Sequence, residues 1–275
     1  MKRLLLTGAS GFLGAAVRQA LKGTSFMVAG RTKVEGADFF EADLSNPGFT
    51  SRLPECSALI HMAAEARLDE CERDPEKARK VNVEATRELA HWSFKLGIPM
   101  VFTSTDLVFG GHKAPYAEGA SPDPISEYGR QKAETEREVM KASPLARVLR
   151  LSLLYDVERP NFLSKALKDL ASGQPVNCYV DEWRTPVWVE SAARAVLLAL
   201  EVPPGIYHAG GAKRMSRFDM VEKAAKARGL NTNLVRSVSR MTHPLGRHRP
   251  EDVSLTSAKL LDLGWRAAPY DRLIQ

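Results

Sequence analysis

Short apolar runs alternate with longer amphipathic stretches through the first 155 residues of this 275-residue chain. An apolar run of a few residues, bounded by turn residues, is typical of a strand that is buried on both faces. The pattern predicts strands at residues 2–7, 25–30, 39–42, 58–62, 100–104 and 148–154. The stretches at 12–21, 76–96 and 127–141 lie between those strands and are predicted to be helices. Strands that alternate with helices predict an α/β fold with a parallel sheet covered on both faces.

After residue 155 the alternation becomes irregular, and the pattern indicates mainly helices. Asn161 is a candidate N-cap for a helix at 162–171, and Ser216 with Asp219 has the spacing of a capping box. Further helices are predicted at 191–201 and 257–263. We therefore divide the chain into a main domain at 1–155 and a smaller lobe at 156–275, with some segments of the lobe returning to the main fold.

The first predicted strand runs directly into a glycine-rich segment at 8–14, with the sequence GASGFLG. Glycine has no β-carbon, so the turn can be tight and its backbone can approach a pyrophosphate. The following helix would add free N–H groups and the positive end of its dipole. The segment therefore predicts dinucleotide binding on a Rossmann-type, doubly wound sheet, and a simple glycine turn is the alternative. The candidate contacts are Gly8, Ser10, Gly11, Phe12, Leu13 and Gly14.

The residue after the second predicted strand bears on which dinucleotide is bound. An NAD-binding protein usually carries an acidic residue there for the ribose hydroxyls, whereas this chain has Arg31 and then Lys33. A carboxylate would repel a 2′-phosphate, but the guanidinium of Arg31 can pair with it through two donors. Arg31 therefore favours NADP(H), and the alternative is an arginine in a solvated loop.

Tyr128 and Lys132 stand four residues apart in the predicted helix 127–141, which places both side chains on one face. A free phenol has a pKa of about 10, and lowering it by about three units requires roughly 4 kcal/mol. An ammonium group about 4 Å away supplies that much at an effective dielectric of about 20. The pair therefore predicts a tyrosine that acts as acid and base near neutral pH. Tyrosine and lysine at this spacing also occur by chance on solvated helices.

These motifs together resemble the extended short-chain dehydrogenase/reductase family, and within it the dTDP-4-dehydrorhamnose reductase-like group. The resemblance covers most of the chain. It rests on the three glycines, Asp43-Leu44, Ala63-Ala64, Val81-Asn82-Val83, the segment STDLVFG at 104–110, Tyr128 with Lys132, and Arg249-Pro250 followed by Leu255 and Lys259.

The resemblance implies a role for several of these residues. Thr105 would orient the carbonyl of a substrate, Tyr128 would donate the proton, and Lys132 would bind the cofactor ribose while tuning Tyr128. Asp43 would lie by the adenine. The remaining implied cofactor contacts are Leu44, Ala63 and Ala64.

Two positions depart from the pattern of the group, and both concern the substrate more than the reaction. Leu107 stands where tyrosine is frequent, and Val187 follows Pro186 where the sugar reductases tend to carry threonine. Leu107 also replaces the acidic residue expected of a dehydratase.

Composition excludes several other classes of function. Lys and Arg number 39 against 33 Asp and Glu, a net charge of +6 without a concentrated basic run, which favours an anionic small molecule over nucleic acid. Cys56, Cys71 and Cys178 have neither disulfide nor zinc spacing, and the scattered histidines indicate no metal site, so a reducing cytoplasm is expected. No apolar stretch has the length of a membrane span, so no membrane partner is expected.

The favoured function is an NADPH-dependent reductase of a keto group, with a nucleotide-linked deoxysugar as the expected substrate. A sugar nucleotide epimerase or dehydratase is one alternative, although an epimerase usually retains NAD, which Arg31 disfavours. A non-catalytic, NADP-binding regulatory subunit is another. The number of subunits stays open, and a homodimer is one option.

Some residues keep two interpretations. Trp183 and Trp188 either pack internally or line the pocket, and Arg247 or Arg249 either contacts a diphosphate or belongs to a solvated loop. Asn82 either supports the active site or caps its helix, and we favour the cap.

Overall fold

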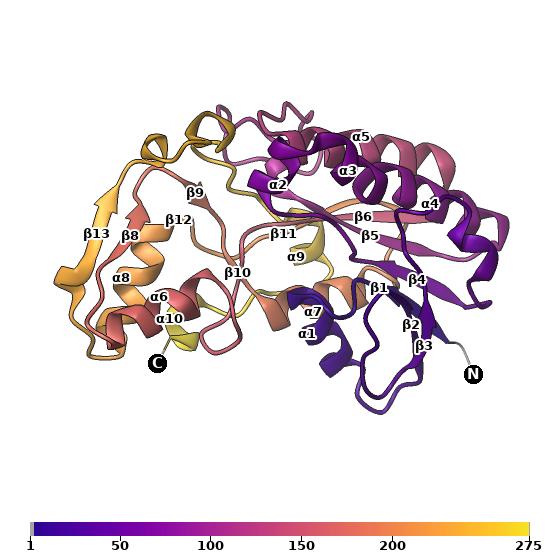
Figure 1. The fold of residues 1–275 in the computed structure, drawn as a ribbon, viewed down its shortest axis with the longest axis horizontal. Helices are drawn as coiled ribbons and strands as arrows, with labels where there is room; N and C mark the ends of the chain where they lie inside the picture. The colour runs from indigo at the N-terminus through magenta and orange to yellow at the C-terminus, as the bar shows by residue number, and fades with distance from the viewer. Residues whose placement is uncertain (1–2, 275) are drawn as a thin grey trace.

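The computed structural model describes residues 3–274, and a seven-stranded parallel sheet forms its centre (Figure 1). The strand order is β3-β2-β1-β4-β5-β6-β11, which confirms the predicted Rossmann-type α/β fold. The strands are β1 (Leu4–Thr7), β2 (Phe26–Gly30), β3 (Asp38–Glu41), β4 (Ala58–His61), β5 (Met100–Thr105), β6 (Ala146–Leu151) and β11 (Gly205–Ala209).

Six of these strands coincide with the predicted apolar runs, and two differences have local causes. The run at 148–154 is not one strand, because β6 ends at Leu151 and the short strand β7 (Leu154–Tyr155) then pairs with β10 (Val187–Trp188). Strand β11 was not predicted. It follows Pro203 and Pro204, which are typical of a loop, and it lies at the sheet edge, where it pairs only with β6.

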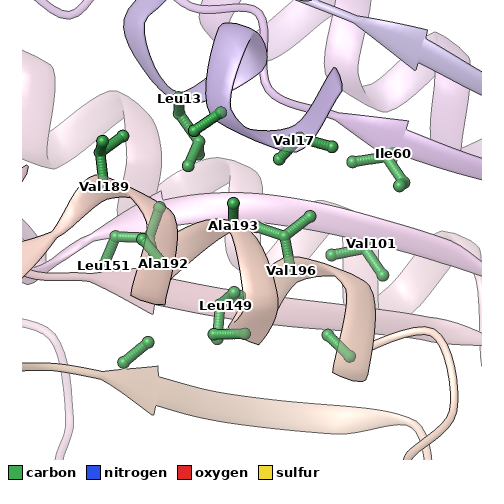
Figure 2. Packing of buried hydrophobic residues seen from close by; sticks show 14 of the residues in the cluster. Leu13, Val17, Ile60, Val101, Leu149, Leu151, Val189, Ala192, Ala193 and Val196 are labelled. Carbon is green, nitrogen blue, oxygen red and sulfur yellow. The ribbon is translucent and has the colours of Figure 1, made fainter. Parts of the chain in front are cut away.

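Helices cover both faces of the sheet through two separate hydrophobic clusters. On one face α1 (Phe12–Ala20) packs on α7 (Val189–Leu198), and Val17, Val196 and the strand residue Leu149 meet in a cluster of buried side chains (Figure 2). On the other face α4 (Ala85–Lys95) and α5 (Glu127–Ala142) cover a second cluster. The sheet is therefore buried on both faces, as its near-continuous apolar strands require.

The predicted helix at 76–96 is interrupted. The structure has α3 (Pro75–Arg79), a π-helical turn (Lys80–Glu84) and then α4, with the short helix α2 (Leu68–Arg73) before them. Asn82 lies inside the π-helical turn, so the favoured interpretation as a helix cap is wrong. Its side chain accepts a hydrogen bond from the backbone N–H of Glu65 at 2.9 Å and donates to the Glu65 carbonyl and to Gln131 Oε1. Asn82 therefore joins the loop after β4 to α5.

The second half of the chain contributes both to the sheet and to a smaller lobe. Figure 1 shows α6 (Phe162–Ala171) and α8 (Arg217–Ala227) beside the two-stranded parallel ladder of β8 (Val176–Tyr179) and β13 (Val235–Val238). Asn161 caps α6, and Ser216 with Asp219 forms the predicted capping box of α8. The remaining short elements are β9 (Trp183–Arg184), β12 (Met215–Ser216), α9 (Ala258–Asp262), α10 (Tyr270–Leu273) and five short 3-10 turns, of which Asp106–Val108 lies at the site below.

Among residues 3–274, the helices are all too short or too polar to cross a lipid bilayer. Cys56, Cys71 and Cys178 are free thiols. Within the same described range, His, Cys, Asp and Glu side chains form no cluster of three or more that could hold a metal ion.

Candidate active site

Two adjoining cavities lie at the carboxyl ends of the parallel strands, where ligands of such sheets bind. The larger has a volume of about 560 Å³ and the smaller about 250 Å³, and both touch Gly8 and Gly11. The larger is lined by Phe12, Leu13, Gly14, Thr105, Tyr128 and Lys132, among others. The smaller is lined by Ser10, Arg31, Asp43, Leu44 and Ala63, among others, and Ala64 borders both. Every candidate residue therefore lines one of two cavities that share Gly8, Gly11, Met62 and Ala64.

The glycine-rich turn has no room for side chains at its two ends. A β-carbon on Gly8 would lie 2.5 Å from the backbone nitrogen of Ala63, and one on Gly14 would lie 2.2 Å from the Gly8 carbonyl oxygen. Gly8 also has φ of 70°, a conformation that favours glycine. Gly11 caps α1 without a side-chain hydrogen bond, so the N–H groups of the first turn stay available to an anion.

The smaller cavity brings Arg31 and Asp43 together. Hydrogen bonds from the backbone N–H and hydroxyl of Ser45, at 2.9 and 2.7 Å, lower the pKa of the Asp43 carboxyl, and the Arg31 charge lowers it further. Arg31 is exposed at the cavity and makes no hydrogen bond or ion pair within residues 3–274. Its guanidinium is therefore free to meet a ligand phosphate.

The helix that carries Tyr128 and Lys132 begins as predicted, because Ser126 caps α5 by accepting a hydrogen bond from Gly129 N–H at 3.1 Å. Lys132 is only 2% exposed, and its ammonium group donates to the Thr103 carbonyl at 2.7 Å and lies 3.9 Å from the centre of the Phe102 ring. Burial lowers the pKa of Lys132 to about 7, although the Glu136 carboxylate raises it. The lysine therefore titrates near neutral pH.

The acidity of Tyr128 differs from the prediction. The pKa of its phenol is raised above the ordinary value, first by burial and then by the charges of Cys71 and Asp106, whereas Arg184 and Thr105 lower it. The prediction was wrong because it counted the attraction of Lys132 but not the loss of water around a phenol that is 8% exposed.

A buried carboxylate that the sequence analysis missed lies next to Thr105. Asp106 is 1% exposed and accepts hydrogen bonds from Ser152 Oγ at 2.8 Å, Thr105 Oγ1 at 3.3 Å and the Arg184 guanidinium. Arg184 comes from β9, far along the chain. The sequence motif around Thr105 includes Asp106, but no spacing in the sequence indicated that Arg184 would pair with Asp106.

A cluster of arginines forms the wall of the larger cavity on the side of the lobe. The buried Glu182 lies 3.5 Å from Arg217, 3.4 Å from Arg249 and 3.9 Å from Arg184. Burial raises the pKa of Glu182, but the three arginines outweigh it, and the net direction is down. With both carboxylates ionised, the three arginines, Asp106 and Glu182 give this wall a net charge of +1. Burial raises the pKa of Asp106, although Arg184 and Ser152 lower it, and protonation of Asp106 makes the wall more positive.

The residues with two interpretations are now placed. Arg249 lines the larger cavity, whereas Arg247 is exposed elsewhere in its loop. Trp183 carries the Arg214 guanidinium on its ring at 3.8 Å, and Trp188 packs against the hydrophobic clusters. The packing interpretation therefore holds for Trp188. Trp183 is half-buried beneath Arg214 and lies outside the residues that line the two cavities. Of the two arginines, only Arg249 lies at the cavity.

A parallel sheet with a glycine turn and a Tyr-Lys pair at its carboxyl edge defines a protein of the Rossmann-type dehydrogenase and reductase class. The family model described as RmlD substrate binding domain matches residues 1–273. The chain therefore belongs to this family, within the extended short-chain dehydrogenases and reductases.

Individual proteins similar to the chain include proteins named as reductases and a subunit of a methionine adenosyltransferase. Methionine adenosyltransferase 2 subunit beta of Xenopus tropicalis is 33% identical over 96% of this chain and 83% of its own length. The probable low-salt glycan biosynthesis reductase Agl14 of Haloferax volcanii is 30% identical over 93% of this chain and 91% of its own. The crystal structure of dTDP-4-dehydrorhamnose reductase from Bacillus anthracis in complex with NADP has a TM-score of 0.88, at 23% identity, and covers 100% of this chain and 98% of that one.

Proposed function

We propose that this protein is an NADPH-dependent reductase of a keto group on a nucleotide-linked deoxysugar. The observation that carries the proposal is that Thr105, Tyr128 and Lys132 line one cavity, which shares Gly8 and Gly11 with the adjoining cavity beside Arg31. A protein that only bound a dinucleotide would need the glycine turn but not a buried tyrosine and lysine together at the far end.

NADPH, when bound, would supply the hydride that reduces the carbonyl carbon. Tyr128 would hold the proton that the carbonyl oxygen receives. Lys132 would bind the ribose, and its buried amine, with a pKa of about 7, can restore the proton near neutral pH. Thr105 accepts a hydrogen bond from Leu107 N–H and donates to Asp106, so it would have to turn its proton from Asp106 to the substrate in order to orient the carbonyl.

The choice of NADPH rests on Arg31, which is exposed at the smaller cavity and occupies the position where NAD-binding proteins usually carry an acidic residue. The reductase from Bacillus anthracis was crystallised with NADP. Titration of the protein with NADPH and NADH should give tighter binding of NADPH, and Arg31→Ala should remove most of the difference. Equal affinity of the wild-type protein for both dinucleotides contradicts this part of the proposal.

The anionic substrate rests on the wall formed by Arg184, Arg217 and Arg249, whose net charge favours a diphosphate. Among the solved structures similar to this chain, MoeE5 was crystallised with UDP-glucose and NAD. That likeness is at 22% identity and speaks for the fold alone.

The test is NADPH oxidation with a panel of nucleotide-linked 4-keto sugars, with the same sugars without the nucleotide as controls. We expect turnover only with the nucleotide-linked sugars, and we expect Tyr128→Phe to lose about 10²- to 10⁴-fold in kcat while NADPH binding is unchanged. No turnover with any member of the panel, or turnover equal in Tyr128→Phe, would refute the reductase.

A non-catalytic regulatory subunit is the second candidate, and the similarity to methionine adenosyltransferase 2 subunit beta favours it. It predicts NADPH binding without turnover of any keto sugar. It also predicts that the protein changes the kinetics of a methionine adenosyltransferase catalytic subunit in a mixture of purified proteins. Turnover that depends on Tyr128, with no effect on such a subunit, would exclude it.

A cytoplasmic location, a substrate-binding role for the lobe at 156–275 and a homodimer are further parts of the proposal. The three free cysteines fit a reducing compartment. Sedimentation of the purified protein would decide between monomer and dimer.

A further inference from the structure

The short turn Asp106–Val108 is held directly against the residue that follows Tyr128. Gly129 allows this approach, because a β-carbon there would lie 2.2 Å from the Leu107 carbonyl oxygen. Tyr128 and Leu107 also share a small hydrophobic cluster with Cys71. The turn that begins at Asp106 is therefore fixed by backbone packing against the helix that carries Tyr128.

The groups whose charges or hydrogen bonds act on the pKa of the phenol come from several elements. Cys71 lies on α2, Thr105 ends β5, Asp106 begins the turn and Arg184 lies on β9. Lys132, on the same helix, directs its ammonium group to the Thr103 carbonyl. At the mouth of the cavity lie Arg67 and Asp69, and in its wall the cluster around Glu182. Lys132 loses its charge near neutral pH, whereas Arg184 stays charged at every relevant pH.

The pairing of Asp106 with Arg184 joins two parts of the chain that are 78 residues apart. Both side chains are buried and both line the larger cavity, and the Nε of Arg184 has no hydrogen-bond partner within residues 3–274. Ser152 holds the second oxygen of Asp106, and the backbone N–H of Thr185 holds Ser152. The pair is therefore fixed from both sides.

We propose that Asp106 and Arg184 are positioning residues that set the acidity of the Tyr128 phenol in opposite directions, Arg184 favouring the phenolate and Asp106 the phenol. The importance of this acidity rests on the proposed function, in which Tyr128 gives up a proton. Arg184 lies on β9, which pairs with β12 at the start of the lobe helix α8. The acidity of the phenol therefore depends on how the lobe packs against the main domain.

The test measures the phenol directly and needs no turnover. A fluorinated tyrosine, which titrates at lower pH than tyrosine, is incorporated at position 128, and its fluorine NMR signal is followed with pH. The wild-type sequence is compared with Asp106→Asn, Arg184→Gln and the double variant. We expect Asp106→Asn to lower the phenol pKa, Arg184→Gln to raise it, each by about one pH unit or more, and the double variant to lie between them.

Two variants serve as controls. Arg214→Gln removes an arginine that directly precedes β12, pairs with Asp252 and lies over the ring of Trp183 on β9. Arg214 is outside the cavity-lining residues, so the variant should leave the phenol signal unchanged. Arg184→Lys keeps the charge and should restore the wild-type pKa to within a few tenths of a unit. If Arg184→Gln does not fold, Asp106→Asn and Arg184→Lys still test the sign and the charge.

Shifts of the same sign in Asp106→Asn and Arg184→Gln, or no shift in either, would overturn the proposal. A second readout is the pH profile of NADPH oxidation. In each variant, the limb of the profile that reports Tyr128 should move in the same direction as the pKa of the phenol. The NMR result stands whether or not the protein proves to be a reductase, so a failure of the proposed function is seen separately as an absence of turnover.

Discussion

Replacement of Lys132 by methionine should stabilise the ligand-free protein at neutral pH. The folded protein lowers the pKa of this lysine from 10.5 to about 7, a difference of about 3.5 pH units. Because the unfolded chain keeps the proton up to about pH 10.5, the folded state carries a cost of about 5 kcal/mol below pH 7, which declines as the pH rises from 7 to 10.5. At pH 7 the remaining cost is about 4 kcal/mol.

Methionine has similar length and no charge, but it loses the hydrogen bond to the Thr103 carbonyl and the contact with the Phe102 ring. These losses amount to roughly 1 kcal/mol, which leaves a net gain of about 3 kcal/mol at pH 7 and about 1 kcal/mol at pH 9. Guanidinium unfolding of both proteins at pH 7, 8 and 9 measures the difference, and effects of other titrating groups cancel in it.

The exposed Lys141 on the same helix provides the control, since Lys141→Met should change the stability by less than about 0.5 kcal/mol at each pH. A Lys132→Met protein that is less stable than the wild type at pH 7, or an advantage that stays constant up to pH 9, would refute the reasoning. The same variant should lose reductase activity, which makes this lysine a position where function costs stability.

Three further substitutions test the fold around the site. Glu136→Gln leaves the buried Arg150 without its carboxylate and should lower the free energy of unfolding by about 3 to 5 kcal/mol in urea titrations; a loss below 1 kcal/mol would contradict the buried ion pair. Gly14→Ala drives a β-carbon into the Gly8 carbonyl and should abolish NADPH binding in calorimetry, an idea that normal affinity would disprove. Ser216→Ala removes a helix cap and should cost about 1 kcal/mol in thermal unfolding, whereas an unchanged midpoint would argue against the cap.

Features that depend on neighbouring residues were predictable from the sequence. The glycine turn with its flanking strand and helix, the Ser126 cap and the capping box of Ser216 with Asp219 all depend on residues a few positions apart. The position of Tyr128 and Lys132 on one face of a helix follows from the helical period in the same way. These features account for the predicted contacts of the glycine turn, Tyr128 and Lys132. The contacts of Asp43, Leu44, Ala63, Ala64 and Thr105 were predicted only from the resemblance to the family.

Features that depend on distant contacts were not predictable. The partner of Asp106 is 78 residues away, and the edge strand β11 pairs with β6 residues that lie 58 positions earlier, as in Gly205 with Arg147. The direction of the Tyr128 pKa depends on how much water is excluded by the elements packed around the phenol, which no local pattern records. The π-helical turn that contains Asn82 has the same polarity pattern as an ordinary helix, so the break in the predicted helix was invisible.

Strand β11 and helix α7, from the second half of the chain, belong to the main domain, and this determines which fragments of the protein can fold independently. A fragment ending at residue 155 would carry the glycine turn and the Tyr-Lys pair, but it would lack β11 and α7. Strand β6 would then present a bare hydrogen-bonding edge, and α1 would expose the apolar side that Val196 and its neighbours cover. Such a fragment should self-associate rather than fold, so exchange of lobes between relatives requires joining points inside the second half of the chain.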